Sequence, residues 1–321
     1  TPTRYYDSYQ IYELVYEESG QEKIQKTSVK IETIFYKELY TYEDWQTIEA
    51  GTYQNYRLMA DIDFTGKTDI NQNLTIGRLE ADENKTLKNI QIETSSNMAS
   101  LIREVQTSVK NINFENITII STYASQANYN GIIGTSSANI SNLNFKNITI
   151  DIPTNGYIGI IGMANSGNIE NINLENINIK GKTYVGGFIG RAINAKIQGV
   201  EAKDIIVEAS GNYVGGILGH QTYYTETESR LRNIYADNIN IVGGTYIGGI
   251  LGFGKGYNLT VINSNITGSS YIGGIIGNMQ SAEGDGNIDD SNLLSQNNRI
   301  SGSREKIRWN CGIYGLFTTC R

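Results

Sequence analysis

A seven-residue phrase, Tyr184-Val185-Gly186-Gly187-Phe188-Ile189-Gly190, decides how the rest of this chain is organised. Clear copies return as YVGGILG at 213–219, YIGGILG at 246–252 and YIGGIIG at 271–277, and looser copies stand at 129–134, 157–162 and 312–315. Their closing glycines lie at positions 134, 162, 190, 219, 252, 277 and 315, so the spacing is 28, 28, 29, 33, 25 and 38 residues. Repeats of this length are typical of solenoids, in which each repeat packs only against its neighbours.

A second phrase, apolar-x-Asn-apolar-x-apolar-x-Asn-Ile-x-Ile, alternates with the glycine phrase. Its copies span 109–119, 140–150, 169–179, 197–207 and 231–241. Apolar and polar residues alternate within each run, which is the period of a strand with one buried face. We therefore expect three short strands per repeat, two in the Asn phrase and one in the glycine phrase. Stacked repeats would hydrogen-bond along the axis at a spacing of ~4.8 Å. The sequence predicts an all-β fold: a right-handed parallel β-helix over 46–321, preceded by a small antiparallel β module or cap over 1–45.

Each recurrent residue type has a physical role in such a stack. Glycines let the chain turn at corners and approach the next coil where a Cβ would clash. Aligned amides predict two side-chain ladders. The first slot holds Asn111, Asn142, Asn171 and Asn233, and the second holds Asn116, Asn147, Asn176, Asp204 and Asn238. The recurring tyrosines predict an aromatic column, for which packing is favoured over sugar binding: Tyr184, Tyr213, Tyr246 and Tyr271.

Composition narrows the classes of function. The net charge of the 321-residue chain is -7, and no basic cluster is present, which argues against a nucleic-acid partner. No apolar run approaches membrane length, so no membrane insertion is expected. With one His and two Cys, the usual Cys/His zinc patterns cannot form, and neither a metal site nor a cofactor is predicted. Cys311 and Cys320 are disulfide candidates that would clamp the C-terminus in an oxidising compartment, and two free thiols remain the alternative.

Departures from the repeat are the places where binding residues are expected. The connection after Gly219 lengthens to 220–230, and the one after Gly277 lengthens to 278–287. Both insertions would leave the same corner of the rod, two coils apart. The first offers aromatic and hydrogen-bonding groups for a glycan or a protein, and these form the predicted ligand site: His220, Tyr223, Tyr224, Glu226 and Glu228. A tolerated surface insertion is the alternative interpretation.

Two acidic stretches are interpreted as structural and not as cation sites. Asp61 and Asp63 follow a predicted strand, where carboxylates usually form turns. The stretch 283–290 matches the register of a repeat corner, and its ligand order does not fit a calcium loop.

The phrase Tyr-x-Gly-Gly-(Ile/Phe)-(Ile/Leu)-Gly resembles the GLUG motif of Gram-positive surface proteins. That motif occurs notably in the region N-terminal to the catalytic domain of immunoglobulin-A-cleaving zinc metallopeptidases. The lead-in at 56–63 is similar to the Tyr-x-Leu-x-x-Asp-Ile-Asp entry seen before such repeats. The family's His-Glu-x-x-His zinc motif is missing here, because the single histidine, His220, is followed by Gln221. The resemblance implies a noncatalytic part of a larger surface protein.

We therefore expect a noncatalytic, extracellular module of a bacterial surface protein, attached to the cell or secreted. It would act as a rigid stalk or as a recognition surface for a host immunoglobulin or glycan. One alternative is a carbohydrate-active β-helix enzyme, a lyase or hydrolase. Another is a structural protein that self-associates end to end, because open β-helix ends can stack unless they are capped.

Overall fold

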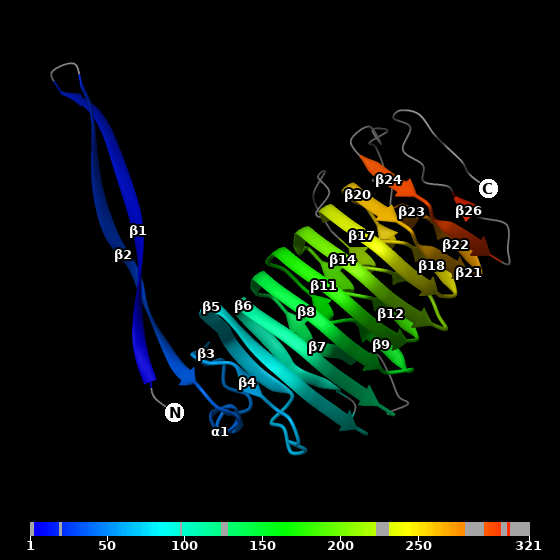
Figure 1. Ribbon diagram of the computed structural model, residues 1–321, viewed down its shortest axis with the longest axis horizontal. Helices are drawn as coiled ribbons and strands as arrows, with labels where there is room; N and C mark the ends of the chain where they lie inside the picture. Colours follow the sequence, from blue (N-terminus) through cyan, green and yellow to red (C-terminus); the bar gives the residue numbers. More distant parts are fainter. Residues whose placement is uncertain are drawn as a thin grey trace.

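The computed structural model describes residues 3–18, 21–96, 98–122, 128–222, 231–279, 292–302 and 307–308. Strands of successive repeats lie side by side in one elongated stack, which runs from β3 to β25 (Figure 1). The pairings between repeats are parallel, and residues at equivalent repeat positions face one another, as Ile177 faces Ile205. The predicted parallel β-helix is confirmed.

The Asn phrase forms one long bent strand in most repeats, where two short strands were expected. These long strands are β5 (Leu74–Thr94), β6 (Ser100–Ser121), β8 (Asn139–Asp151), β11 (Asn168–Gly181), β14 (Lys196–Ala209) and β17 (Leu231–Val242). The division into two strands appears only in the last two described repeats, as β20 (Tyr257–Ile262) with β21 (Asn265–Gly268) and β24 (Leu293–Gln296) with β25 (Arg299–Gly302). Asn171 and Asn176 bend β11 because their φ angles, 56° and 55°, are left-handed. Neighbouring coils bend at the same place, so the parallel pairing continues across the bend.

The glycine phrase divides into two short strands. The first file comprises β9 (Asn155–Ile158), β12 (Thr183–Gly186), β15 (Val214–Gly215), β18 (Thr245–Gly248), β22 (Ser270–Gly273) and β26 (Ile307–Arg308). The second file comprises β10 (Ile161–Ala164), β13 (Ile189–Ile193), β16 (Leu218–Thr222), β19 (Leu251–Gly254) and β23 (Ile276–Met279). Strand β7 (Asn128–Ser136) serves both files, since it pairs with β9 and with β10.

In the four clear copies of the glycine phrase, the left-handed residue is the tyrosine and not a glycine. Tyr184 and Tyr213 have φ angles of 55° and 63°, a conformation that costs a residue with a Cβ roughly 1–2 kcal/mol. The glycines are needed for close approach instead. A Cβ on Gly187 would lie 2.1 Å from the carbonyl oxygen of Gly216 in the next coil. The expectation that glycines allow neighbouring coils to approach is confirmed at this position.

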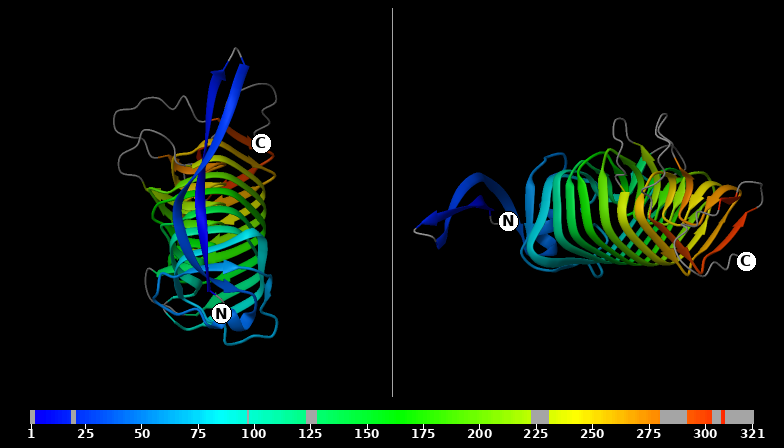
Figure 2. Two further views of the ribbon diagram at one scale, coloured as in Figure 1. Left: turned by 90° about the vertical axis from the view of Figure 1, so that its left-hand side faces the viewer. Right: turned by 90° about the horizontal axis from the view of Figure 1, so that it is seen from above.

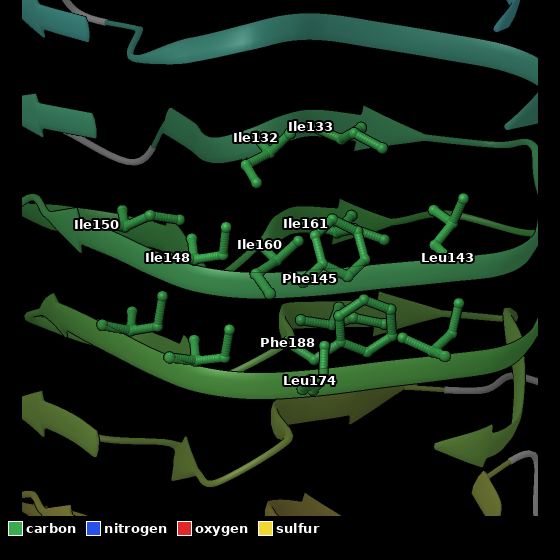
Figure 3. Close-up of a cluster of buried hydrophobic side chains, with 14 of the residues drawn as sticks. Ile132, Ile133, Leu143, Phe145, Ile148, Ile150, Ile160, Ile161, Leu174 and Phe188 are labelled. Carbon is green, nitrogen blue, oxygen red and sulfur yellow. The ribbon is translucent and has the colours of Figure 1, made fainter. Parts of the chain in front are cut away.

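The interior is a continuous column of apolar side chains from both walls of the coil. Figure 3 shows Phe145, Ile148 and Ile150 from β8 pointing inward, towards Ile160 and Ile161 from the opposite wall. All five are buried. Phe114 stacks on Phe145 in the next coil, with ring centroids 5.0 Å apart. At ~25 cal/mol per Å² of buried apolar area, this column is the main source of stability.

A hairpin and a short helix precede the stack. Strands β1 (Thr3–Glu18) and β2 (Gln21–Leu39) pair antiparallel and project beyond the first coils (Figures 1 and 2). The end of β2 pairs in parallel with β3 (Asn55–Leu58), so the hairpin is joined to the stack by strand pairing. The two-residue strand β4 (Ile62–Asp63) then pairs with β5. The antiparallel β element expected within 1–45 is confirmed, and the domain boundary at residue 45 stays a prediction.

Helix α1 (Tyr42–Gln46) covers the start of the core. Thr41 and Asp44 form a capping box, in which each side chain bonds the other's backbone N–H. Trp45 is fully buried and meets the edge of Phe64, with ring centroids 5.7 Å apart. Its indole N–H donates to the Asn71 carbonyl oxygen at 2.9 Å. A bulky aromatic pair therefore closes the N-terminal end of the apolar column.

The close approach of neighbouring coils at Gly187 can be tested by substitution. We expect Gly187→Ala to lower the free energy of unfolding by about 3 kcal/mol, the upper end of overpacking costs, because backbone stands in the way of the new methyl group. Gly51→Ala is the control, since no atom lies within 4 Å of the added Cβ and only the positive φ of 78° is penalised, by about 1 kcal/mol. Urea unfolding followed by circular dichroism measures both. Equal losses in the two variants would contradict the close-approach role.

Candidate ligand-binding site

Two files of left-handed asparagines form amide ladders along the outside of the stack, as the sequence predicts. In the first file, Asn142 Nδ2 donates to Asn111 Oδ1 at 3.0 Å, and Asn171 Nδ2 donates to Asn142 Oδ1 at 3.2 Å. In the second file the same bond links Asn147 to Asn116 at 2.9 Å and Asn176 to Asn147 at 2.8 Å. In these bonds the amide nitrogen points towards the N-terminal end of the rod.

The ladders hold the geometry of the bends. An L-residue with a left-handed φ is strained, and asparagine tolerates this conformation better than most residues do. The same side chain then donates to one neighbour and accepts from another, so each amide stabilises two bends.

A third amide file lies between the other two, and the sequence interpretation missed it. Asn144 Nδ2 donates to Asn113 Oδ1 at 2.6 Å, and Asn173 Nδ2 donates to Asn144 Oδ1 at 2.7 Å. In the next coils Glu201, Tyr235 and Thr260 occupy this file. The outward face between the two bends is therefore covered by amides on one side of β14 and by mixed polar groups on the other.

An open depression of ≈ 630 Å³ lies along this face. Its floor belongs to five neighbouring coils, those of β8, β11, β14, β17 and β20, and Asn84 of β5 adds to one end. The floor residues are Asn142, Asn144, Asn171, Asn173, Gly199, Val200, Glu201, Asn233, Ile234, Tyr235, Asn258 and Thr260. At ~4.8 Å per coil, the lining extends roughly 20 Å along the rod. This volume is in the range of small-ligand sites, roughly 300–1,000 Å³.

The chemistry of the lining is polar, with one prominent aromatic ring. Tyr235 is 43% exposed, although large aromatic side chains are mostly buried. Amide groups, a carboxylate and a phenol surround the depression, and such groups bind hydroxyl-bearing ligands through hydrogen bonds and ring stacking. The sequence carried a signal for this site: Gly199 stands in the first Asn slot of the copy at 197–207, and Glu201 stands where the three preceding copies have Asn113, Asn144 and Asn173.

The predicted aromatic column is present on a different side of the coil. Tyr157, Tyr184, Tyr213, Tyr246 and Tyr271 stack with ring centroids 4.8–5.0 Å apart. None of these tyrosines lines the depression. The interpretation of the column as packing is consistent with these contacts.

His220 belongs to this aromatic packing. Its ring stacks on Phe253 with centroids 5.0 Å apart and meets the edge of Tyr213 at 4.9 Å. Its Nδ1 lies 3.2 Å from Thr222 Oγ1. Burial, and then the nearby positive charge of Arg191, lower the pKa of His220 from 6.5 to about 4. The imidazole is therefore neutral at physiological pH.

The remainder of the predicted corner site lies outside the described residues. Tyr223, Tyr224, Glu226 and Glu228 are in this group, as are Cys311 and Cys320 and the stretch 283–290. The strands from which the two insertions depart, β16 and β23, are separated by β19 alone in one sheet. The ligand site at this corner and the disulfide stay predictions.

Of the two early carboxylates, Asp63 forms a local turn, as expected, whereas Asp61 bonds the backbone of the next coil. Asp63 accepts hydrogen bonds from the backbone N–H of Thr65 at 2.9 Å and from Asn89 Nδ2 at 2.8 Å. Hydrogen bonds from Thr65 and Asn89 lower the pKa of Asp63 to about 2. Asp61 accepts from the backbone N–H of Thr86 at 2.8 Å. Within the described ranges, no three side chains of the types His, Cys, Asp and Glu gather closely enough to hold a metal ion.

Comparison with known proteins gives a likeness of fold. No family model matches the chain, and no curated protein matches it. Among solved structures, the chain is similar to the crystal structure of a putative immunoglobulin A1 protease from Bacteroides ovatus. The identity is 18%, the alignment covers 83% of this chain and 84% of that chain, and the TM-score is 0.48. The resemblance to the GLUG motif stays a prediction. In the part of the chain that the structure describes, no helix combines the length and apolar character needed to cross a bilayer.

The ladder predicts an order of stability among variants at Asn147. We expect Asn147→Ala to cost about 2–3 kcal/mol, because two ladder bonds are lost and alanine is strained at a φ of 56°. Asn147→Gly loses the same bonds without the strain and should cost about 1 kcal/mol less. Asn178→Ala, an exposed position of the same phrase outside the ladders, should change stability by less than about 0.5 kcal/mol. Urea midpoints measure the series, and a glycine variant less stable than the alanine variant would refute the left-handed assignment.

The single histidine allows a direct test of its environment. We expect NMR titration to give His220 a pKa of about 4, well below the 6.5 of a free histidine. A histidine with a lowered folded-state pKa contributes stability above pH 6.5, and this contribution is lost as the pH falls towards 4. Since the ring is partly exposed, the loss should be on the order of 1 kcal/mol. His220→Phe can keep the stack on Phe253, and its stability should not fall in this way between pH 6.5 and pH 4. If His220 of the wild type titrates near pH 6.5, the buried packing of its ring is contradicted.

Proposed function

We propose that this chain is a noncatalytic β-helix module of a bacterial surface protein, and that it presents a rigid recognition surface for a glycan. The observation that supports this most is the amide-lined depression on a stiff support. Its floor strands β11, β14 and β17 are hydrogen-bonded on both sides, and the core beneath them is filled by buried Ile, Leu, Val, Phe and Ala side chains. A surface of this kind is preorganised, so little ordering is required on binding.

A glycan fits this surface better than an immunoglobulin chain for a physical reason. A peptide that adds a strand needs a free sheet edge, and the floor strands have none because both edges are paired. Recognition must then proceed through side chains. Amides, a carboxylate and an exposed phenol ring suit the hydroxyl groups and ring faces of sugars.

The noncatalytic part of the proposal is supported by the lining of the depression. Glycoside hydrolysis generally uses two carboxylic acids that flank the scissile bond. Glu201 is the single carboxylate among the lining residues. A lyase or hydrolase remains the alternative function, and the extracellular location is part of the proposal.

Binding without turnover is the expected result of a direct test. The intact chain is applied to an immobilised panel of neutral oligosaccharides (malto-, cello-, manno- and chitohexaose and neutral N-glycans), with sialylated and uronate-containing sugars and immunoglobulin A on the same surface. We expect retention of at least one neutral glycan and no release of reducing ends or unsaturated products from it. Product release would support the enzyme instead, and retention of immunoglobulin A alone would overturn glycan recognition.

A further inference from the structure

All three amide files of the outward face lose their hydrogen bond between β11 and β14, although Asp204 in the second file still accepts from Asn238 Nδ2 at 2.6 Å. Pairing of β11 with β14 places Gly199 opposite Asn171, Glu201 opposite Asn173, and Asp204 opposite Asn176. The next coil restores asparagine in two of the files, at Asn233 and Asn238. Inward positions of β14 follow the repeat normally, since Ile197, Val200 and Ile205 are buried. The departure is therefore confined to the face that carries the depression.

The interruption at Gly199 leaves two hydrogen-bonding groups unused, one on each side. The first amide file resumes beyond the gap, where Asn258 Nδ2 donates to Asn233 Oδ1 at 2.8 Å and Asn292 continues it at 3.0 Å. Asn171 Oδ1 would receive the next amide nitrogen, and Asn233 Nδ2 would donate to the next amide oxygen, but Gly199 supplies neither. Neither atom has a hydrogen-bond partner within the described residues. An acceptor and a donor thus face each other across two coil spacings, about 10 Å between backbones.

The gap beside Gly199 is open, and no neighbouring side chain occupies it. A Cβ placed on Gly199 would lie 3.5 Å from Asn171 Oδ1, which is ordinary contact, so the position could hold an asparagine. Gly199 has a φ of 64°, the left-handed angle that asparagines adopt at the equivalent positions. The backbone of the ladder therefore continues, and one amide side chain alone is missing.

Acceptors predominate around this gap. Asn171 Oδ1 and Asn173 Oδ1 lack donors from β14, and the Glu201 carboxylate can only accept. Asn233 Nδ2 and the Tyr235 hydroxyl supply the donors. A ligand that satisfies this set must itself donate several hydrogen bonds and carry no negative charge. Neutral sugar hydroxyls meet both conditions, because each can donate and accept.

We propose that the coil of β14 is the centre of a binding site for a neutral oligosaccharide, in which one sugar hydroxyl takes the place of the missing amide at Gly199. That hydroxyl donates to Asn171 Oδ1 or accepts from Asn233 Nδ2, and a sugar ring stacks on the exposed face of Tyr235. The chain of sugars lies along the rod, over the neighbouring coils that line the depression. This assignment deepens the proposed function and rests on it.

Filling the gap from within the protein tests the assignment. Gly199→Asn should rebuild the first ladder, so we expect the variant to fold with a melting temperature equal to or above that of the wild type. The same side chain should displace the sugar hydroxyl and weaken binding of the retained neutral hexaose at least tenfold, as measured by isothermal titration calorimetry on the intact chain. A stable variant with unchanged affinity would overturn the site.

A second pair of variants separates stacking from folding. Tyr235→Ala should reduce the affinity for the same hexaose at least tenfold, whereas Tyr257→Ala, an equally exposed tyrosine outside the lining at 41%, should leave it within twofold. Equal effects of the two changes would contradict the assignment. If neutral sugars bind the wild type but Gly199→Asn and Tyr235→Ala bind them equally well, glycan recognition survives and this site fails. If the wild type retains only anionic sugars, glycan recognition survives and the site for a neutral oligosaccharide fails. If it retains only immunoglobulin A, or retains nothing, both proposals fail.

Discussion

Parallel hydrogen bonding from coil to coil is the constraint on which the remaining structure depends. It fixes each residue opposite its equivalent in the next repeat, as Ile172 lies opposite Val200 and Val200 opposite Ile234. Side chains of the same kind then stack at one spacing, inside as an apolar column and outside as amide and tyrosine files. A strained backbone angle is tolerated for the same reason, because the neighbouring coils adopt it too. The left-handed angles of Asn147 and Asn176 are one example.

The sequence predicts this architecture well because the repeat is written in it twice, once by glycine and tyrosine and once by asparagine. What it could not supply was the conformation of each repeated residue. The glycine pattern suggests that glycines make the turns, yet Tyr184 and Tyr213 carry the positive φ while Gly187 makes room for the next coil. The regular spacing of residues along the chain shows where it repeats. It does not tell which atom would collide with which.

The candidate site was harder to predict for a related reason. The insertion after His220 changes the length of the repeat, which a sequence shows directly, whereas β14 keeps the length and changes only the side chains. Asp204 belongs to the second ladder, as predicted, because it accepts from Asn238 Nδ2 at 2.6 Å, but a carboxylate cannot donate a hydrogen bond to Asn176. The two substitutions, Gly199 and Glu201, can be read in the sequence. Their meaning depends on the strand pairing, which places them opposite Asn171 and Asn173.

A rod of this kind can carry such a departure because its stability and its outward chemistry come from different atoms. The backbone pairing of β14 with both neighbours is intact across Gly199, and the inward side chains there remain buried. A hydrogen bond between two side-chain amides in an exposed ladder contributes only about 1 kcal/mol to the free energy of unfolding, whereas a buried apolar side chain contributes about 1.5–3 kcal/mol. Losing a few ladder hydrogen bonds in one coil is therefore a small change beside an interior that continues through more than two hundred residues. Inward positions have no such freedom, since a cavity there would disturb the coils on both sides. Binding chemistry in this fold is thus expected where the outward side chains change while the inward ones continue the repeat, and β14 is such a place.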